Sequence, residues 1–88
     1  PFSMEQIYAR RAAANGDADR LVTRAIRDIN HCGFATNEME RGFADLVNWV
    51  ANGVKPAGDD ILTPAAVANP NFGCQFSAPG HPLAPACP

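Results

Sequence analysis

The sequence predicts an α/β architecture in which one strand lies between two amphipathic helices. We expect the first helix over residues 4–15, the strand over residues 20–29 and the second helix over residues 36–52. A single strand cannot satisfy the hydrogen-bonding groups along both of its edges. We therefore expect this chain to be one part of a larger α/β fold, not an independent domain, with the rest of the sheet supplied elsewhere.

The first helix has clear signals at both ends. Ser3 and Gln6 have the spacing of a capping box, in which each side chain satisfies a free backbone amide of the first turn. The Asn15-Gly16 pair is typical of a residue in the left-handed conformation that ends a helix. These signals predict a helix that begins near Met4 and stops at Asn15.

Residues 20–29 form the candidate strand, although their pattern is ambiguous. The segment is short, rich in β-branched residues and bounded by Gly16 and Gly33, which favours a strand. We prefer the strand, partly because of a family resemblance given below. The apolar residues nevertheless recur at helical spacing, which favours a helix: Leu21, Val22, Ala25, Ile26 and Ile29.

The second helix combines a cap, acids in the first turn and a regular apolar stripe. Thr36 or Asn37 is the expected cap, and Glu38 lies where the helix dipole favours negative charge. Gly53 is expected to end the helix. The apolar stripe predicts one covered face and consists of Met39, Phe43, Leu46, Val47 and Val50.

The composition changes after residue 53 and divides the chain into a core segment, residues 1–53, and a tail, residues 54–88. Seven of the eight prolines lie in the tail, which predicts an extended segment with one helical turn after Thr63. Cys74 and Cys87 are expected to form a disulfide there, which leaves Cys32 unpaired within the chain. A disulfide implies an oxidising compartment, so we expect a secreted or periplasmic protein.

Charge and hydropathy exclude some classes of partner. The formal net charge of −2 gives no reason to expect nucleic acid or an anionic membrane surface. No apolar run approaches the roughly 20 residues that are needed to cross a bilayer. With 47% hydrophobic and 18% charged residues, the composition is that of a folded chain and not of a disordered one.

His31 is the candidate catalytic residue. It follows the expected strand and precedes the expected second helix, and Gly33 permits a tight turn beside it. Ligands and catalytic groups gather at the carboxyl ends of strands in α/β proteins. A loop histidine that is hydrogen-bonded to the backbone has the same context, so position alone does not establish a function.

The order of the segments, and their sequence, resemble the C-terminal end of secreted bacterial α/β-hydrolases. In that fold the nucleophilic serine comes first, an acid follows, and the histidine lies between the last strand and the closing helix. The resemblance covers residues 1–60, and the tail beyond adds nothing to it. It is carried by Glu5–Tyr8, Arg27–Phe34, Glu38, Phe43–Val50 and Gly53–Asp59.

The resemblance implies a serine esterase or amidase in which His31 is the general base. The serine and its Gly-x-Ser-x-Gly turn are absent here, and the family's acid lies upstream of the position of Pro1. We therefore expect the remaining N-terminal portion of the enzyme as partner, a small ester or amide as substrate, and no cofactor or metal. Asp28 points away from His31 along an extended strand and is expected to be structural.

The three cysteines leave further alternatives open. Cys32 beside the histidine resembles tannases and feruloyl esterases, in which a disulfide joins the neighbours of the serine and of the histidine. That resemblance implies a bond from Cys32 to another chain, whereas a buried free thiol is the alternative. The competing class of protein is a small secreted binding or inhibitory module stapled by Cys74 and Cys87. Zinc ligation by these two cysteines and His81 fits no common spacing.

Overall fold

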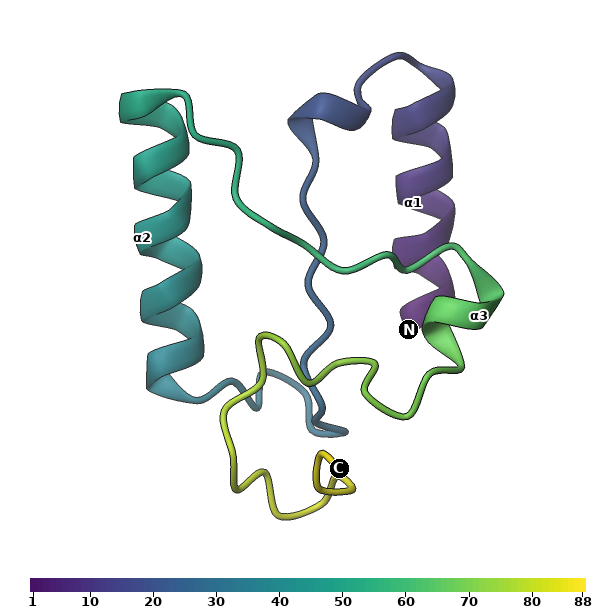
Figure 1. Cartoon of the computed structure of the whole chain (residues 1–88), viewed down its shortest axis with the longest axis vertical. Coiled ribbons are helices and arrows are strands. Elements are labelled where there is room, and N and C mark those ends of the chain that lie inside the picture. Colours follow the sequence, from purple (N-terminus) through teal and green to yellow (C-terminus); the bar gives the residue numbers. More distant parts are fainter.

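The structure is a computed structural model that describes residues 1–88, and it consists of helices joined by extended segments (Figure 1). Helix α1 spans Phe2–Ala14, a short 3-10 turn η1 spans Ala18–Arg20, α2 spans Thr36–Asn52 and α3 spans Pro64–Val67. No residue lies in a β-strand. The α/β fold class expected from the sequence is therefore wrong for this chain, which is helical and has no sheet.

The expected strand is extended but unpaired. Residues 21–29 run between α1 and α2, in the direction opposite to both helices (Figure 1). The carbonyl of Thr23 accepts a hydrogen bond from the backbone amide of Asp59 at 2.7 Å. The next amide on that edge, of Ala25, donates to the Asp59 side chain at 2.7 Å. A strand needs repeated backbone pairs with a neighbour, and here a side chain replaces the second pair.

Helix α1 begins and ends close to the predicted residues, but its cap is different. Pro1 is the N-cap and Ser3 lies inside the first turn, where it caps nothing. Gln6 donates its side-chain amide to the carbonyl of Ile61 at 2.8 Å, so it is unavailable for a capping box. The C-terminal signal holds, because Gly16 has a φ of +79°.

Helix α2 matches its predicted range, again with a different N-terminal cap. Ala35 is the N-cap, and Glu38 Oε1 accepts its backbone N–H at 2.7 Å. Thr36 and Asn37, the expected caps, are the first two residues of the helix. Gly53 ends the helix in the left-handed conformation with a φ of +69°, as expected.

The tail contains the short helix and the disulfide that the sequence predicts. Helix α3 follows Thr63, and Cys74 is bonded to Cys87 with their Cα atoms 5.8 Å apart. The tail also supplies the few buried residues of the chain, which are Ile61, Gly73 and Phe76. The tail therefore packs against the extended segment and is more than an outer covering.

The chain leaves much of its apolar surface exposed. Only 3 of 88 residues are buried, and the accessible surface of 6274 Å² exceeds the about 5,000 Å² expected for a folded monomer of this mass. The radius of gyration, 13.6 Å, is also larger than the about 12 Å expected. The whole apolar stripe of α2 is exposed, from 48% at Val47 to 81% at Val50.

Candidate functional site

His31 lies in the turn that follows the extended segment. Its side chain is exposed and makes no hydrogen bond within the chain. The turn is tight, because Cys32 has a φ of +55° in the left-handed region. Cys32 is a free, exposed thiol, so the expected alternative of a buried thiol is wrong for the chain by itself.

Asp28 holds this turn from the inside. Its Oδ1 accepts the backbone amides of Ile29 at 2.7 Å and of Asn30 at 3.2 Å. Gly33 packs against the same carboxylate so closely that a Cβ at this position would overlap with it. Glycine is therefore required at position 33. The turn of residues 30–33 is fixed around Asp28, and the side chain of His31 points to solvent on its outer side.

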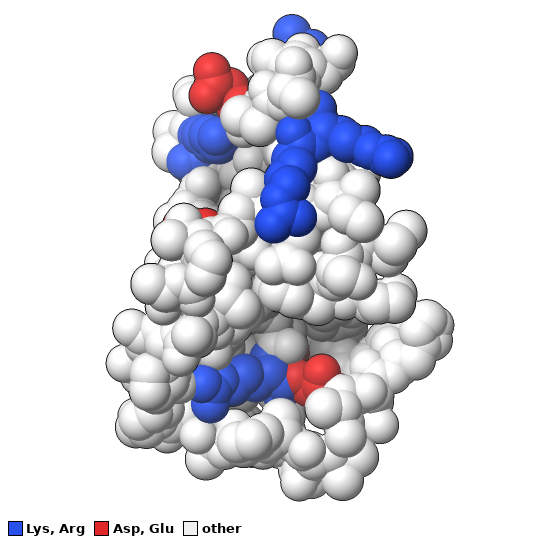
Figure 2. All heavy atoms as spheres, turned by 90° about the vertical axis from the view of Figure 1, so that its right-hand side faces the viewer, with Lys and Arg blue, Asp and Glu red and all other residues white.

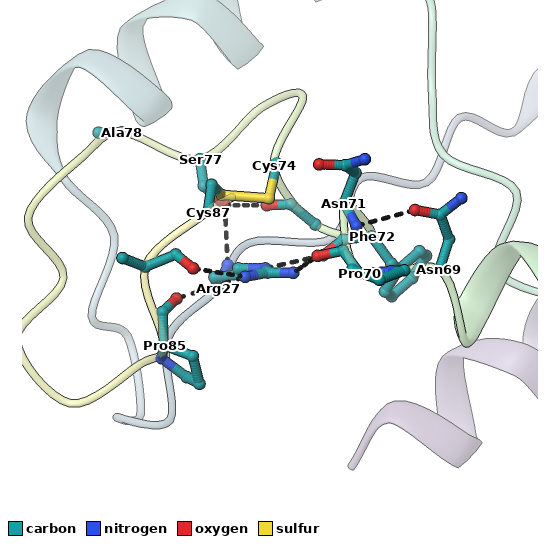
Figure 3. Close-up of a disulfide and its surroundings, with 12 residues drawn as sticks. Arg27, Asn69, Pro70, Asn71, Phe72, Cys74, Ser77, Ala78, Pro85 and Cys87 are labelled. Carbon is teal, nitrogen blue, oxygen red and sulfur yellow. Dashed lines mark hydrogen bonds between the residues drawn. A yellow bond between two sulfur atoms is a disulfide. The ribbon is translucent and has the colours of Figure 1, made fainter.

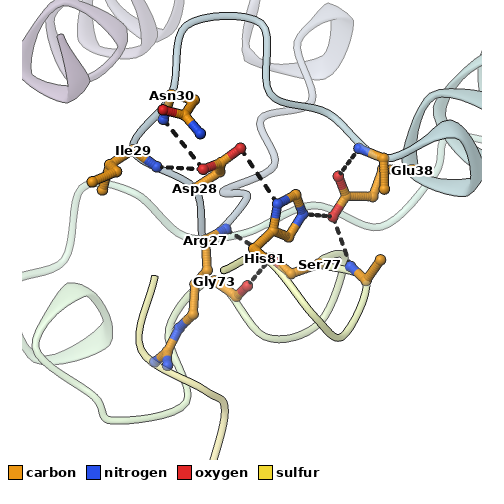
Figure 4. A network of polar contacts seen from close by, with 10 residues as sticks. Arg27, Asp28, Ile29, Asn30, Glu38, Gly73, Ser77 and His81 are labelled. Atoms are coloured by element: carbon orange, nitrogen blue, oxygen red, sulfur yellow. Dashed lines mark hydrogen bonds and ion pairs between the residues drawn. The ribbon is translucent and has the colours of Figure 1, made fainter. Parts of the chain in front are cut away.

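A cluster of three ionisable side chains that are largely shielded from solvent lies behind the turn and consists of Asp28, His81 and Glu38 (Figure 4). His81 Nε2 is 2.7 Å from Glu38 Oε2, and His81 Nδ1 is 3.3 Å from Asp28 Oδ2. The side chains are only 10%, 3% and 8% exposed for His81, Glu38 and Asp28. The imidazole thus joins the turn and the first turn of α2 to the tail.

The contacts of the cluster change the protonation of two of its members. The hydrogen bond to Glu38 is the main reason why the pKa of His81 is raised above 6.5, and it outweighs the opposing effect of burial. For Glu38, burial acts to raise the pKa, but hydrogen bonds from the Ala78 amide, from His81 and from the Ala35 amide lower it below 4.5. Both shifts favour the ion pair of a charged imidazole and a carboxylate.

This cluster anchors the tail and is not arranged as an acid–base site. Each ring nitrogen of His81 faces a carboxylate, so neither nitrogen is free to take a proton from a nucleophile. Sequence reasoning considered His81 only as a zinc ligand with Cys74 and Cys87. Those two cysteines are joined in a disulfide and are not thiolate ligands. No local signal could have indicated the cluster, because Glu38 and His81 are 43 residues apart.

Arg27 ties the extended segment to the tail beside the disulfide (Figure 3). Its backbone amide donates to Ser77 Oγ at 2.8 Å. Its guanidinium donates to tail carbonyls, among them that of Phe72 at 2.8 Å and that of Ala86 at 3.2 Å. It also donates to the carbonyls of Pro70 and Pro85.

The two serines of the chain are not placed to act with His31. Ser3 lies in the first turn of α1. Ser77 accepts from the Arg27 amide and donates its hydroxyl to the carbonyl of Gly73, so it is engaged in holding the tail. A serine nucleophile for His31, supplied by another polypeptide segment, therefore stays a prediction from the sequence.

A hollow lies alongside the extended segment on the α1 side. It has a volume of about 540 Å³, is lined by residues 21–28 and is flanked by Phe2, Tyr8 and Phe34. Figure 2, which views the α1 side, shows a largely uncharged surface with basic side chains near one end. In the lower half of this view, a basic and an acidic side chain lie together in a depression.

The chain matches no known protein family, no curated protein and no solved structure. The resemblance to secreted α/β-hydrolases therefore stays a prediction from residues 1–60. No helix of the chain is both long and apolar enough to cross a membrane.

Proposed function

We propose that this chain is a segment of a serine hydrolase that cleaves a carboxylic ester or amide, and that His31 is its general base. The observation that carries the proposal is the placement of His31. It stands exposed at the end of an extended segment between two helices, in a turn fixed by Asp28, with no partner for its ring within the chain. An imidazole presented in this way is free to accept a proton.

In the proposed mechanism, His31 takes the proton of a serine hydroxyl as the oxygen attacks the acyl carbon. The imidazolium then gives this proton to the leaving alcohol or amine. A carboxylate is needed to hold the other ring nitrogen and to stabilise the imidazolium. Asp28 does not meet this need, because its Oδ2 faces His81 and its Oδ1 binds the turn. The acid and the serine are therefore assigned to the remaining portion of the enzyme.

The uncovered surface supports a partner of this kind. The chain exposes about 1,300 Å² more than a folded monomer of its mass is expected to expose. The apolar stripe of α2 is part of that surface, while the polar side of the helix packs on the chain through Glu38 and Asp45. The disulfide in the tail fits an oxidising compartment, so we place the enzyme outside the cell or in the periplasm.

The disulfide also favours a second candidate, a small secreted binding module that folds alone. The disulfide closes only the loop from Cys74 to Cys87, which is far in sequence from the two long helices. It leaves the apolar stripe of α2 in contact with solvent, whereas a self-sufficient module is expected to cover such a stripe. The hydrolase segment is therefore the better account.

The test is substitution of His31 in the assembled enzyme, with turnover of p-nitrophenyl butyrate and of its anilide as the readout. His31→Ala is expected to lower kcat by at least about 10³-fold without changing the circular dichroism spectrum. His81→Asn is the matched control, because it removes the other histidine and is expected to affect stability but not the chemical step. Turnover that is unchanged in His31→Ala would refute the proposed mechanism.

A further inference from the structure

Helix α2 is covered on one side and uncovered on another. The residues that face the rest of the chain are half-buried and recur every three or four positions: Glu38, Gly42, Asp45 and Trp49. The apolar stripe lies on a different side of the helix, and each of its side chains is at least 48% exposed. The helix lies at one side of the molecule and touches no other helix of the chain (Figure 1). A continuous apolar stripe in contact with solvent indicates a surface that binds another protein.

The spacing of the stripe is the same when it is read from either end of the helix. Four of its members follow one another at intervals of four, three and four residues, which is the repeat of a two-helix coiled coil: Met39, Phe43, Leu46 and Val50. When a second α2 lies antiparallel to the first, Met39 meets Val50 of the second copy, and Phe43 meets Leu46 of the second copy. Every apolar residue then faces an apolar residue, and the same four residues serve both copies, as two-fold symmetry requires.

The charges of α2 favour the antiparallel arrangement. All charged residues of the helix lie before residue 46, and residues 46–52 are uncharged. Glu38, Arg41 and Asp45 are bound to other parts of the chain, which leaves Glu40. An antiparallel pair places Glu40 at the level of the uncharged last turns of the second copy, and it sets the two helix dipoles in opposite directions. A parallel pair would bring both N-termini and both Glu40 side chains to the same level.

We propose that the apolar stripe of α2 binds a second copy of this chain, so that the two α2 helices pack antiparallel about a two-fold axis between Phe43 and Leu46. The proposal goes beyond the proposed function and does not rest on it. The hollow on the α1 side lies outside this contact. The remaining portion of the enzyme therefore keeps a surface to bind in each copy of the pair.

The surface available is large enough for a stable pair. A standard interface buries about 800 Å² on each partner, and the chain exposes about 1,300 Å² more than a folded monomer of its mass. The stripe also continues into a space of about 400 Å³, which Ile26 and Phe34 line together with Met39 and Phe43. The side chains of a second helix can fill this space, so the contact extends beyond the stripe itself.

The first test places a charge in the middle of the stripe. Phe43→Glu and Leu46→Lys are each expected to weaken the pair at least about 100-fold, because two-fold symmetry puts the charge against an apolar side chain twice. Phe43 is 69% exposed and Leu46 is 51% exposed, so the circular dichroism spectrum is expected to stay unchanged. Ala44→Glu is the matched control, since it adds the same charge at an exposed position on a different side of the helix.

The second test measures the direction of the pair with single cysteines, in a background that carries Cys32→Ser. A disulfide needs Cα atoms closer than about 7 Å, whereas positions 39 and 50 lie about 16 Å apart along one helix. We expect Met39→Cys mixed with Val50→Cys to form a cross-linked pair on mild oxidation. Either variant alone is expected to form none. Cross-linking of each variant with itself would show a parallel pair and overturn the proposal.

Native mass spectrometry of the chain, with any polypeptide that remains bound to it, counts the copies of this chain in each particle, and sedimentation equilibrium gives their affinity. We expect two copies for the unsubstituted chain and for Ala44→Glu, and one copy for Phe43→Glu and Leu46→Lys at the same concentration. One copy of the unsubstituted chain at up to about 1 mM, or a pair that Phe43→Glu leaves intact, would overturn the proposal. A single copy whose stripe is covered by a larger polypeptide would also overturn it, while agreeing with the proposed function.

Discussion

Replacement of Arg27 by methionine is expected to release the tail from the extended segment while leaving α1 and α2 intact. The guanidinium donates hydrogen bonds to the carbonyls of Pro70, Phe72, Pro85 and Ala86 (Figure 3). Methionine keeps most of the length of the side chain and removes every donor. The backbone amide of residue 27 and its bond to Ser77 are retained.

The free energy lost in Arg27→Met follows from the number of hydrogen bonds removed and from their exposure to solvent. A hydrogen bond from a charged donor contributes about 1.5–3 kcal/mol when it is shielded from water. Three of the four guanidinium hydrogen bonds are exposed to solvent, so we expect a loss of only about 2–3 kcal/mol for the whole set. The released form of the tail would then become roughly 30- to 150-fold more populated.

Amide hydrogen exchange measures this release directly. The amide of Cys74 donates to the carbonyl of Asn71 and the amide of Ala78 donates to Glu38 Oε2, and both amides are expected to exchange faster in Arg27→Met by that factor. Arg27→Lys keeps the charge but not the fork of donors, so an intermediate effect is expected. Exchange at Cys74 and Ala78 that is the same in Arg27→Met and in the unsubstituted chain would refute the reasoning.

Two further predictions concern the anchoring of the tail. Replacement of both Cys74 and Cys87 by serine is expected to lower the free energy of unfolding by about 3 kcal/mol, from the sequence separation of 13, and an unchanged urea midpoint would contradict this. The raised pKa of His81 means that its contribution is complete below pH 6.5 and is lost as the pH rises through the raised value. The lowered pKa of Glu38 means that its contribution is complete above pH 4.5 and is lost as the pH falls through the lowered value. Urea midpoints of the unsubstituted chain and of His81→Asn should therefore differ most between pH 4.5 and 6.5, and a difference independent of pH would count against the ion pair.

The helices could be predicted because their signals are local. Gly16 and Gly53 adopt the left-handed conformation at the residues where the sequence indicates helix ends. Pro64 opens α3 directly after Thr63, as the sequence predicts. The caps were predicted less well, because a side chain that can cap a helix can also bind elsewhere. Gln6 is an example, since its amide reaches Ile61, 55 residues away.

The strand was predicted wrongly for a different reason. Sequence indicates that residues 21–29 prefer an extended conformation, and they are extended. Whether an extended segment is a strand depends on a neighbour, and here the neighbour is the side chain of Asp59. Gly58 permits this approach, because a Cβ there would lie 2.7 Å from the carbonyl of Thr23. This pairing joins residues 34 positions apart and leaves no local pattern.

In the candidate site too, local features could be predicted from the sequence, whereas contacts between distant residues could not. The position of His31 in an exposed turn before α2 could be predicted from local order. The cluster around His81 could not, because it depends on how the tail returns to Asp28 and Glu38 (Figure 4). The tail was expected to carry a disulfide but not to supply the buried residues Ile61 and Phe76.

The most direct test of the account is native mass spectrometry of the chain purified from its natural source, after treatment with a fluorophosphonate that labels reactive serines. We predict a complex of the 9.3 kDa chain with a larger polypeptide, and the label on that larger polypeptide. Release of the chain only on reduction would place Cys32 in an interchain disulfide. A folded, unlabelled 9.3 kDa monomer would contradict the account and favour the small disulfide-stapled module.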